Sequence, residues 1–223
     1  MVQTFSVEGD VLSNSFSVSY LVLFSYTVVT LIEALTTDVR AARHVMNLET
    51  AVSVVAGYFY MRFAGMAQEP GFKPSDVMPY RYLDWSITTP MLLLAMMLYL
   101  SPARSAGVPW QTFALALVLD YCMLGAGYVG ESGRADRATS GLVGFACFAG
   151  LVAVIWHAFR PEILGSASNK VVFGAFAVVW SMYGVVYYVR DERTRAIAYN
   201  VLDVVAKAML GMYMWATVGH VLH

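Results

Sequence analysis

The sequence predicts an all-α membrane protein, a bundle of seven transmembrane helices with its N-terminus outside. The chain is 59% hydrophobic and only 13% charged, with a mean hydropathy of +0.61, whereas soluble domains carry about 25% charged residues. Its apolar residues gather in seven runs without alternation of polar and apolar positions. Because lipid offers the backbone no hydrogen-bond partners, long runs of this kind are expected to be helices.

Each predicted helix follows from one apolar run and from the polar turn that ends it. A bilayer crossing takes about 20 residues, and the runs comprise residues 15–37, 45–66, 79–101, 108–129, 138–159, 171–189 and 196–222. The turns hold most of the Gly, Pro and charged residues, and they comprise 36–44, 68–79, 101–109, 130–139, 160–170 and 190–195. We expect residues 1–223 to form a single domain in the cell membrane, crossing the bilayer several times.

Charge in the first segments favours an outside N-terminus. Glu8 and Asp10 precede the first run, and Arg40 and Arg43 follow it. Basic residues favour the cytoplasmic side, and the first helix usually decides the orientation. A count over all the loops leans the other way, so the charge rule alone leaves the orientation open.

The totals also exclude some classes of function. A net charge of -1 argues against nucleic acid as a partner. Cys122 and Cys147 both lie in apolar runs and are expected to be small core residues, not a disulfide. No metal site is predicted.

The last apolar run carries two opposite charges near its middle. Asp203 and Lys207 are four residues apart, so they share one face of a helix. Each charge at the centre of a membrane helix costs about 2.5–3.5 kcal/mol on insertion scales. One interpretation is a neutralising ion pair. The other is that Lys207 carries a carbonyl compound, because a desolvated lysine amine readily forms a Schiff base.

The third apolar run carries a second pair of charges. Arg81, Asp84 and Thr88 fall at i, i+3 and i+7, which is one face of a helix, and Pro90 is expected to kink that helix. An ordinary Arg–Asp pair between helices would explain this cluster alone. Asp203 and Lys207 also need partners, however, so one shared, neutral site of four charges is the simpler interpretation.

An aromatic stripe marks the sixth run, where Trp180, Tyr183 and Tyr187 share one helix face. Such a stripe is more often helix packing than the wall of a cofactor site. The fourth run adds Gly127, where the missing side chain lets a flat group or a neighbouring helix approach closely.

Together these motifs resemble the microbial (type 1) rhodopsin family. They are Arg81-Tyr-Leu-Asp84-Trp85-Ser-Ile-Thr88-Thr89-Pro90, Trp180-Ser-Met-Tyr183 and Leu202-Asp203-Val-Val-Ala-Lys207. The resemblance spans the whole chain, and the third- and seventh-helix motifs together are highly specific. It implies a retinal-binding photoreceptor protein and not an enzyme.

The resemblance also implies a role for each matching residue. Lys207 is expected to bind all-trans retinal as a protonated Schiff base, with Asp84 and Asp203 as counterions, Arg81 beside them, and Thr88 bonded to the proton acceptor Asp84. The pocket walls are expected to include Trp85, Leu92, Met123, Gly127, Trp180, Tyr183 and Tyr187, with Thr89 and Asp120 as an interhelical hydrogen-bonded pair. Leu92 implies green absorption.

Three positions depart from the family pattern. Where pumps carry a proton-donating carboxylate on the third helix, this chain has Ala95. Glu49 is the first candidate to replace it, because its position on the second helix is expected to face the Ala95 region, and Glu33 is the second. Either could instead be an interfacial acid. Glu192 is a candidate for outward proton release, although Arg195 lies where a release-group glutamate is often found.

Three functions remain open, with lipid and protons as the shared partners. The first is a light-driven outward proton transporter in which the Schiff-base proton passes to Asp84. The second is a slow-cycling sensor that signals to a separate transducer protein. The third is a light-gated channel lined by Glu33, Glu49 and Asn200. The resemblance also implies a homo-oligomer, with a trimer and a pentamer both usual in the family.

Overall fold

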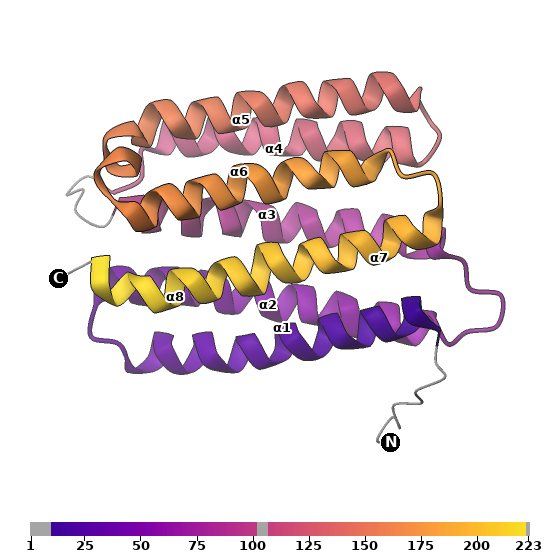
Figure 1. The fold of residues 1–223 in the computed structure, drawn as a ribbon, viewed down its shortest axis with the longest axis horizontal. Helices are drawn as coiled ribbons and strands as arrows, with labels where there is room; N and C mark the ends of the chain where they lie inside the picture. The colour runs from indigo at the N-terminus through magenta and orange to yellow at the C-terminus, as the bar shows by residue number, and fades with distance from the viewer. Residues whose placement is uncertain (1–9, 102–106, 222–223) are drawn as a thin grey trace.

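The computed structural model describes residues 10–101 and 107–221, and it contains no strand within them. In chain order the elements are α1 (Val11–Thr36), α2 (Arg40–Met66), η1 (Pro74–Val77), α3 (Met78–Leu100), α4 (Trp110–Glu131), α5 (Arg137–Gly165), α6 (Ala167–Tyr187), α7 (Glu192–Asp203), η2 (Val204–Met209) and α8 (Leu210–Val221). Because α7, η2 and α8 are continuous, the described residues form the seven-helix membrane bundle that the sequence predicts (Figure 1).

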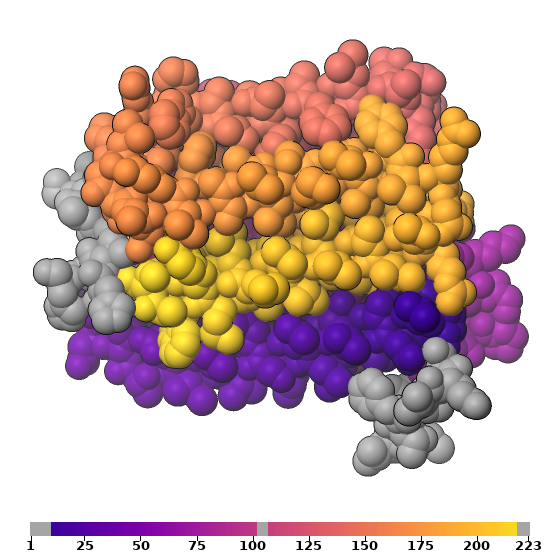
Figure 2. Space-filling view, viewed as in Figure 1, coloured from indigo at the N-terminus to yellow at the C-terminus, as the bar shows by residue number. Residues whose placement is uncertain are grey.

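The helices lie alongside one another and alternate in direction. Figure 1 shows α1 beginning at the end of the bundle where α7 also begins, and α8 ending at the opposite end. We call these the outer end and the inner end, following the predicted orientation. Glu8, which contributed to that prediction, lies outside the described residues. In the space-filling view, α1, α8 and α6 form parallel bands of side chains across one face (Figure 2).

Six of the seven segments are long and apolar enough to cross a membrane by length and composition. The exception is α2, which buries Glu49 and Ser53. Glu49 and Ser53 are buried in the bundle, whereas Arg40, Arg43, His44 and Arg62 are exposed, so the lower hydropathy of α2 reflects both internal polar contacts and charged side chains toward the helix ends.

The seven helices match the predicted runs, but α2 and α7 begin within the predicted turns, at Arg40 and Glu192, and the largest difference lies between the fifth and sixth helices. α5 continues to Gly165 and α6 begins at Ala167, so most of the predicted turn 160–170 is helical. The Ser166 side chain accepts a hydrogen bond from the Asn169 N–H and thereby caps α6. The apolar run ends before the helix does because charged residues can continue a helix into the interfacial region, where their heads reach water.

Candidate functional site

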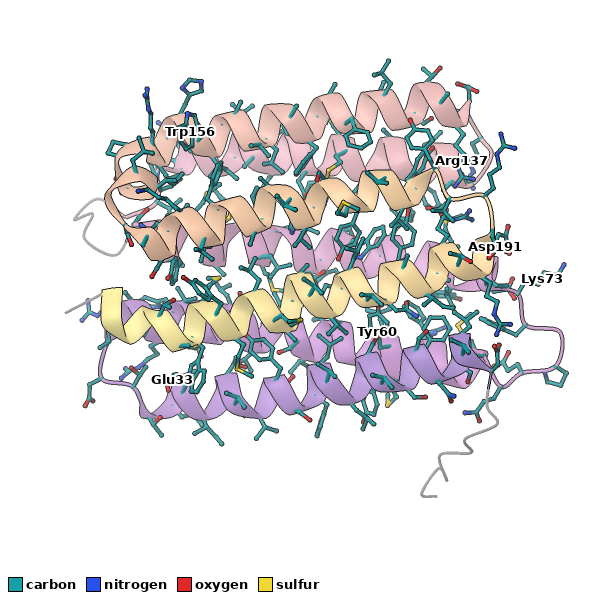
Figure 3. The ribbon with its side chains drawn as sticks, in the orientation of Figure 1. Glu33, Tyr60, Lys73, Arg137, Trp156 and Asp191 are labelled. Carbon is teal, nitrogen blue, oxygen red and sulfur yellow. The ribbon has the colours of Figure 1, made fainter. Side chains whose placement is uncertain are left out.

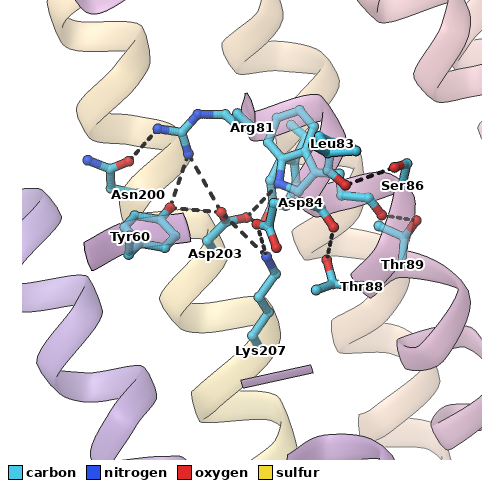
Figure 4. A network of polar contacts seen from close by, with 12 residues as sticks. Tyr60, Arg81, Leu83, Asp84, Ser86, Thr88, Thr89, Asn200, Asp203 and Lys207 are labelled. Atoms are coloured by element: carbon cyan, nitrogen blue, oxygen red, sulfur yellow. Dashed lines mark hydrogen bonds and ion pairs between the residues drawn. The ribbon is translucent and has the colours of Figure 1, made fainter. Parts of the chain in front are cut away.

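Lys207 lies at the centre of the bundle and is almost completely buried, with 1% exposure. The sequence contains three lysines, and the other two, Lys73 and Lys170, are exposed. The Lys207 Nζ lies 2.6 Å from Asp84 Oδ2 and 3.7 Å from Asp203 Oδ2 (Figure 4). One buried cation therefore contacts two buried carboxylates from different helices.

The backbone around Lys207 is a π-helical turn, η2, which interrupts the last transmembrane helix. The Leu210 N–H bonds the Val205 carbonyl, five residues earlier. Such widened turns are rare and occur frequently at functional sites. The sequence analysis did not foresee this turn, because residues 204–209 contain neither proline nor glycine.

Asp203 receives hydrogen bonds from three neutral side chains. The Tyr60 hydroxyl donates to Oδ2 at 2.7 Å, while the Tyr183 hydroxyl and the Trp85 Nε1–H donate to Oδ1 at 2.7 Å and 3.0 Å. Arg81 Nη1 adds an ion pair at 3.6 Å from Oδ2. Hydrogen bonds to the charged form stabilise it, so Asp203 is well supported as an anion.

Asp84 has far fewer partners than Asp203. Apart from its contact with Lys207, its Oδ1 atom is buried and has no hydrogen-bond partner among the described residues. The Thr88 hydroxyl donates to the main-chain carbonyl of Asp84 at 2.9 Å, and not to its carboxylate as the sequence analysis expected. A buried carboxylate oxygen without a donor has a free lone pair, so Asp84 is the member of the pair with room for a proton.

Arg81 is held by neutral groups as well as by charge. Its Nη1 donates to the Tyr60 hydroxyl at 3.0 Å, and its Nη2 donates to Asn200 Oδ1 at 2.6 Å. Asn200 Nδ2 in turn donates to Ser15 Oγ on α1 at 2.7 Å. The sequence analysis placed Arg81 near the acids but did not identify this anchor, because Ser15 is 185 residues from Asn200 in sequence.

α3 carries several of these groups past an internal proline. Pro90 has no N–H to offer the Ser86 carbonyl, and the Tyr121 hydroxyl of α4 donates to that carbonyl instead at 3.1 Å. One residue before the proline, Thr89 donates to Asp120 Oδ2 on α4 at 2.7 Å. Two hydrogen bonds between α3 and α4 therefore stabilise α3 where its own ladder is interrupted.

A cavity lined mainly by apolar side chains extends from Lys207 between the helices. Nine of the ten predicted cofactor contacts line it: Trp85, Thr89, Leu92, Met123, Gly127, Trp180, Tyr183, Tyr187 and Lys207. Asp120 does not line it and lies behind Thr89. A Cβ at Gly127 would approach the Tyr82 hydroxyl to 2.8 Å, so glycine keeps this wall flat.

α5 also contributes to the cavity wall, although no motif in its sequence predicts this contribution. Ser140, Gly141, Gly144, Phe145 and Phe148 all line it. Gly141 and Gly144 are visible in the sequence as two closely spaced small residues. The aromatic residues Phe145 and Phe148 do not stand out, because the whole α5 run is apolar. Tyr60 and Tyr199 were not predicted as site residues either, because only the folded bundle brings Tyr60 to Asp203 and Tyr199 to the cavity wall.

Comparison with known proteins agrees with this geometry. The sequence model of bacteriorhodopsin-like proteins matches residues 10–221. This chain belongs to that family. The family binds retinal through a Schiff base to a lysine, its members include proton pumps and sensory rhodopsins, and they are multi-pass membrane proteins.

Three individual relatives define the similarity further. The crystal structure of the viral rhodopsin OLPVRII has a TM-score of 0.87 and 34% identity, covering 96% of this chain and 100% of that chain. The green-light absorbing proteorhodopsin of Gamma-proteobacterium EBAC31A08 is 27% identical over 188 residues, or 76% of this chain and 72% of the relative. Sensory rhodopsin III of Haloarcula marismortui is 32% identical over 167 residues, or 69% of each chain.

The residues around the cavity fit a retinal group of this family. Among the described residues that line it, Lys207 is the only lysine. The other walls are mainly aromatic, aliphatic or glycine, with Trp85 and Trp180 both buried, and the polar residues Thr89, Ser140 and Asp203 complete the lining. The free Oδ1 atom of Asp84 lies in the carboxylate that contacts the lysine. The site thus offers an attachment amine, anionic partners and an apolar cavity together.

The two outlying acids occupy different environments. Glu49 is buried on α2, where the Tyr26 hydroxyl of α1 donates to its Oε2 at 3.1 Å, so its partner lies on α1. Ala95, which Glu49 was expected to face, packs in an apolar cluster with Met46 and Met97.

Glu192 is exposed in the first turn of α7. It lines a second, outer cavity together with Arg81, Glu131 and Arg195. In that cavity Arg195 Nε lies 2.8 Å from Glu131 Oε1, and the Tyr82 hydroxyl donates to Glu131 Oε2 at 3.0 Å. Glu131 was missed because it lies in the predicted turn 130–139, where an acid usually faces water.

Proposed function

We propose that this chain is a light-driven outward proton transporter that holds all-trans retinal on Lys207. The observation that carries the proposal is the unequal bonding of two acids beside one buried amine. Asp203 has three neutral donors, while one oxygen of Asp84 has none among the described residues. When bound, retinal supplies light absorption and an isomerisation that re-aims the proton-bearing nitrogen.

The unequal bonding assigns different tasks to the two acids. Placing a proton on Asp203 would weaken its hydrogen bonds with Tyr60, Tyr183 and Trp85, whereas Asp84 can accept a proton on Oδ1 without losing a donor. Asp84 is therefore the proton acceptor, and Asp203 stays ionised and keeps a negative charge near the nitrogen. Arg81, anchored by Asn200, balances that charge.

Return of a proton to the Lys207 nitrogen requires a donor on the inner side. Ala95 has no proton to give, so we assign this role to Glu49. Its carboxyl is buried with a tyrosine donor, and no ion pair in the described part of the chain involves it. A carboxyl that is buried without a cation favours its neutral, proton-bearing form.

Photocurrents in a voltage-clamped cell that expresses the chain and is supplied with retinal test this proposal. With equal ion concentrations on both sides, light should drive an outward current at zero membrane potential. Asp84→Asn should abolish it. A current that reverses with the ion gradient would contradict the proposal and identify a channel. Absence of any current from coloured protein would contradict it in favour of a sensor.

The second candidate function is a sensory rhodopsin that signals to a separate transducer. The 32% identity to Sensory rhodopsin III favours it, as does Ala95, because slow reprotonation prolongs the light-induced state. A channel is less well supported, because apolar residues surround Ala95 in the inner half. In either case we propose a homo-oligomer, trimeric or pentameric.

A further inference from the structure

In the inner half of the bundle the α1–α2 interface is polar, whereas α3 contributes mainly apolar side chains, apart from a hydrogen bond between Tyr99 and Thr217 of α8 near the inner end. On the α3 side, Leu93, Ala95, Met96 and Met97 are all buried in one apolar cluster. Water and protons cross such packed apolar regions poorly, because a buried polar species without partners is costly. This packing disfavours a proton route to Lys207 along this part of α3.

The side chains that could carry protons lie between α1 and α2. Tyr26, Thr30 and Glu33 fall at i, i+4 and i+7, so they share one face of α1. On α2, Glu49 accepts the hydrogen bond from Tyr26 at 3.1 Å, and the Thr50 hydroxyl donates to Thr30 at 2.9 Å. These contacts form a hydroxyl and carboxyl seam along the interface.

α8 covers this seam at both of its ends. A Cβ at Gly211 would overlap both the Tyr26 hydroxyl and Glu49 Oε2, so the α8 backbone lies directly against this pair and only glycine leaves room for it. Nearer the inner end, Trp215 Nε1 donates to Glu33 Oε2 at 3.1 Å. Glu33 lies three residues before the end of α1 and near the inner end of the bundle (Figure 3).

We propose that the α1–α2–α8 interface is the inner proton-uptake route of this chain, with Glu33 as its entry, Glu49 as its buried end and Tyr26 as a positioning residue. The proposal deepens the proposed function, on which it rests. Glu49 releases its carboxyl proton toward the Lys207 nitrogen and becomes an anion. It then regains a proton from water by way of Glu33, so no net charge accumulates on the route.

Time-resolved absorption of the purified, retinal-bound protein tests the route. Glu49→Gln should slow the reprotonation of the retinal-bearing nitrogen at least about tenfold. This effect is smaller than the 10²–10⁴-fold typical of a lost general acid, because water still supplies protons. Glu33→Gln should slow it severalfold. The matched control is Asp38→Asn, which removes an exposed carboxylate just beyond the end of α1 and should leave the rate unchanged.

Infrared difference spectra separate positioning from mere packing. Tyr26→Phe keeps the ring but removes the hydroxyl that donates to Glu49. The carbonyl band of the neutral Glu49 carboxyl should move to higher wavenumber, and it should be absent in Glu49→Gln. A purely structural role for Tyr26 would leave that band in place and would overturn its assignment.

The outcomes also separate the route from the proposed function. Reprotonation within twofold of the unsubstituted rate in both Glu49→Gln and Glu33→Gln would overturn the route, even if outward photocurrents persist. Slowed reprotonation in both variants supports the route even if the unsubstituted protein passes no current, a result that would contradict the pump alone. Retinal absorption at the unsubstituted intensity verifies that each variant is folded.

Discussion

Asn200 accepts a 2.6 Å hydrogen bond from the guanidinium of Arg81 in the middle of the bundle. Both side chains are buried, with exposures of 1% and 2%. Because Asn200 also donates to Ser15, this single amide ties α3 and α7 to α1. We interpret the bond as the anchor that keeps the Arg81 charge on the outer side of Asp203.

Asn200→Leu should destabilise the protein by about 1–3 kcal/mol, the cost of leaving buried polar groups unsatisfied. The measurement is the temperature at which the retinal colour is lost. Ser15→Ala keeps the Arg81–Asn200 bond, removes the second bond together with the bond from Ser15 to the Leu12 carbonyl, and should cost about 0.5–1.5 kcal/mol. Equal effects of the two substitutions would show that the Arg81–Asn200 bond contributes nothing beyond the link to α1.

The outer ion pair between Glu131 and Arg195 provides a second test. Both side chains are less than 10% exposed, and Glu131→Gln would leave the Arg195 charge unpaired. We expect a loss of roughly 3 kcal/mol, as for other broken buried pairs, measured as faster thermal bleaching. Tyr82→Phe, which removes only the hydroxyl donor to Glu131, should cost about 1 kcal/mol. Comparable bleaching rates in these two variants would contradict a buried pair.

Asp136 should make the thermal stability of the protein decrease at acidic pH. Asp136 caps α5, and its carboxylate accepts hydrogen bonds from Thr139. The bond from the Thr139 backbone N–H has the largest effect, and together these bonds hold the pKa of the Asp136 carboxyl below the ordinary 3.8. A group with a lowered pKa in the folded state stabilises the fold above its unfolded pKa, and that contribution is lost as the pH falls through the folded value.

Thermal bleaching followed from pH 6 to about 3 measures this contribution. The bleaching temperature should fall below pH 4 partly through Asp136. Asp136→Asn keeps an N-cap side chain but cannot titrate, so it should flatten this part of the profile. An unchanged profile in that variant would assign the acid sensitivity to other groups.

Gly184 lets an aromatic ring of α5 close against α6. A Cβ at this position would overlap the Phe145 ring, and both residues line the central cavity. Gly184→Ala should displace the ring into the cavity, shift the absorption maximum and slow retinal uptake. Adding Phe145→Ala should restore uptake. Failure of this second substitution to do so would show that the ring is not the obstacle.

The sequence predicted the fold and the charged centre for related physical reasons. Seven apolar runs without alternation leave few alternatives to helices in lipid. Charges are so costly in a membrane that Arg81, Asp84, Asp203 and Lys207 had to neutralise one another, and the structure does bring them together.

Contacts between neutral groups were much harder to predict. Pairs such as Tyr26–Glu49, Thr30–Thr50 and Ser15–Asn200 join residues with ordinary side chains on different helices. Their formation depends on how each helix is rotated about its axis, which the apolar pattern of a lipid-facing helix specifies weakly. The π-helical turn at Lys207 has no sequence signal of its own, because residues 204–209 contain neither proline nor glycine.

The most direct test of the central claim is the absorption spectrum of the purified protein after incubation with all-trans retinal. The unsubstituted protein should gain a visible absorption band, and Lys207→Ala should stay colourless. Lys73→Ala and Lys170→Ala, which alter the two exposed lysines, should colour normally. A visible band in Lys207→Ala, or no band in the unsubstituted protein, would contradict the account.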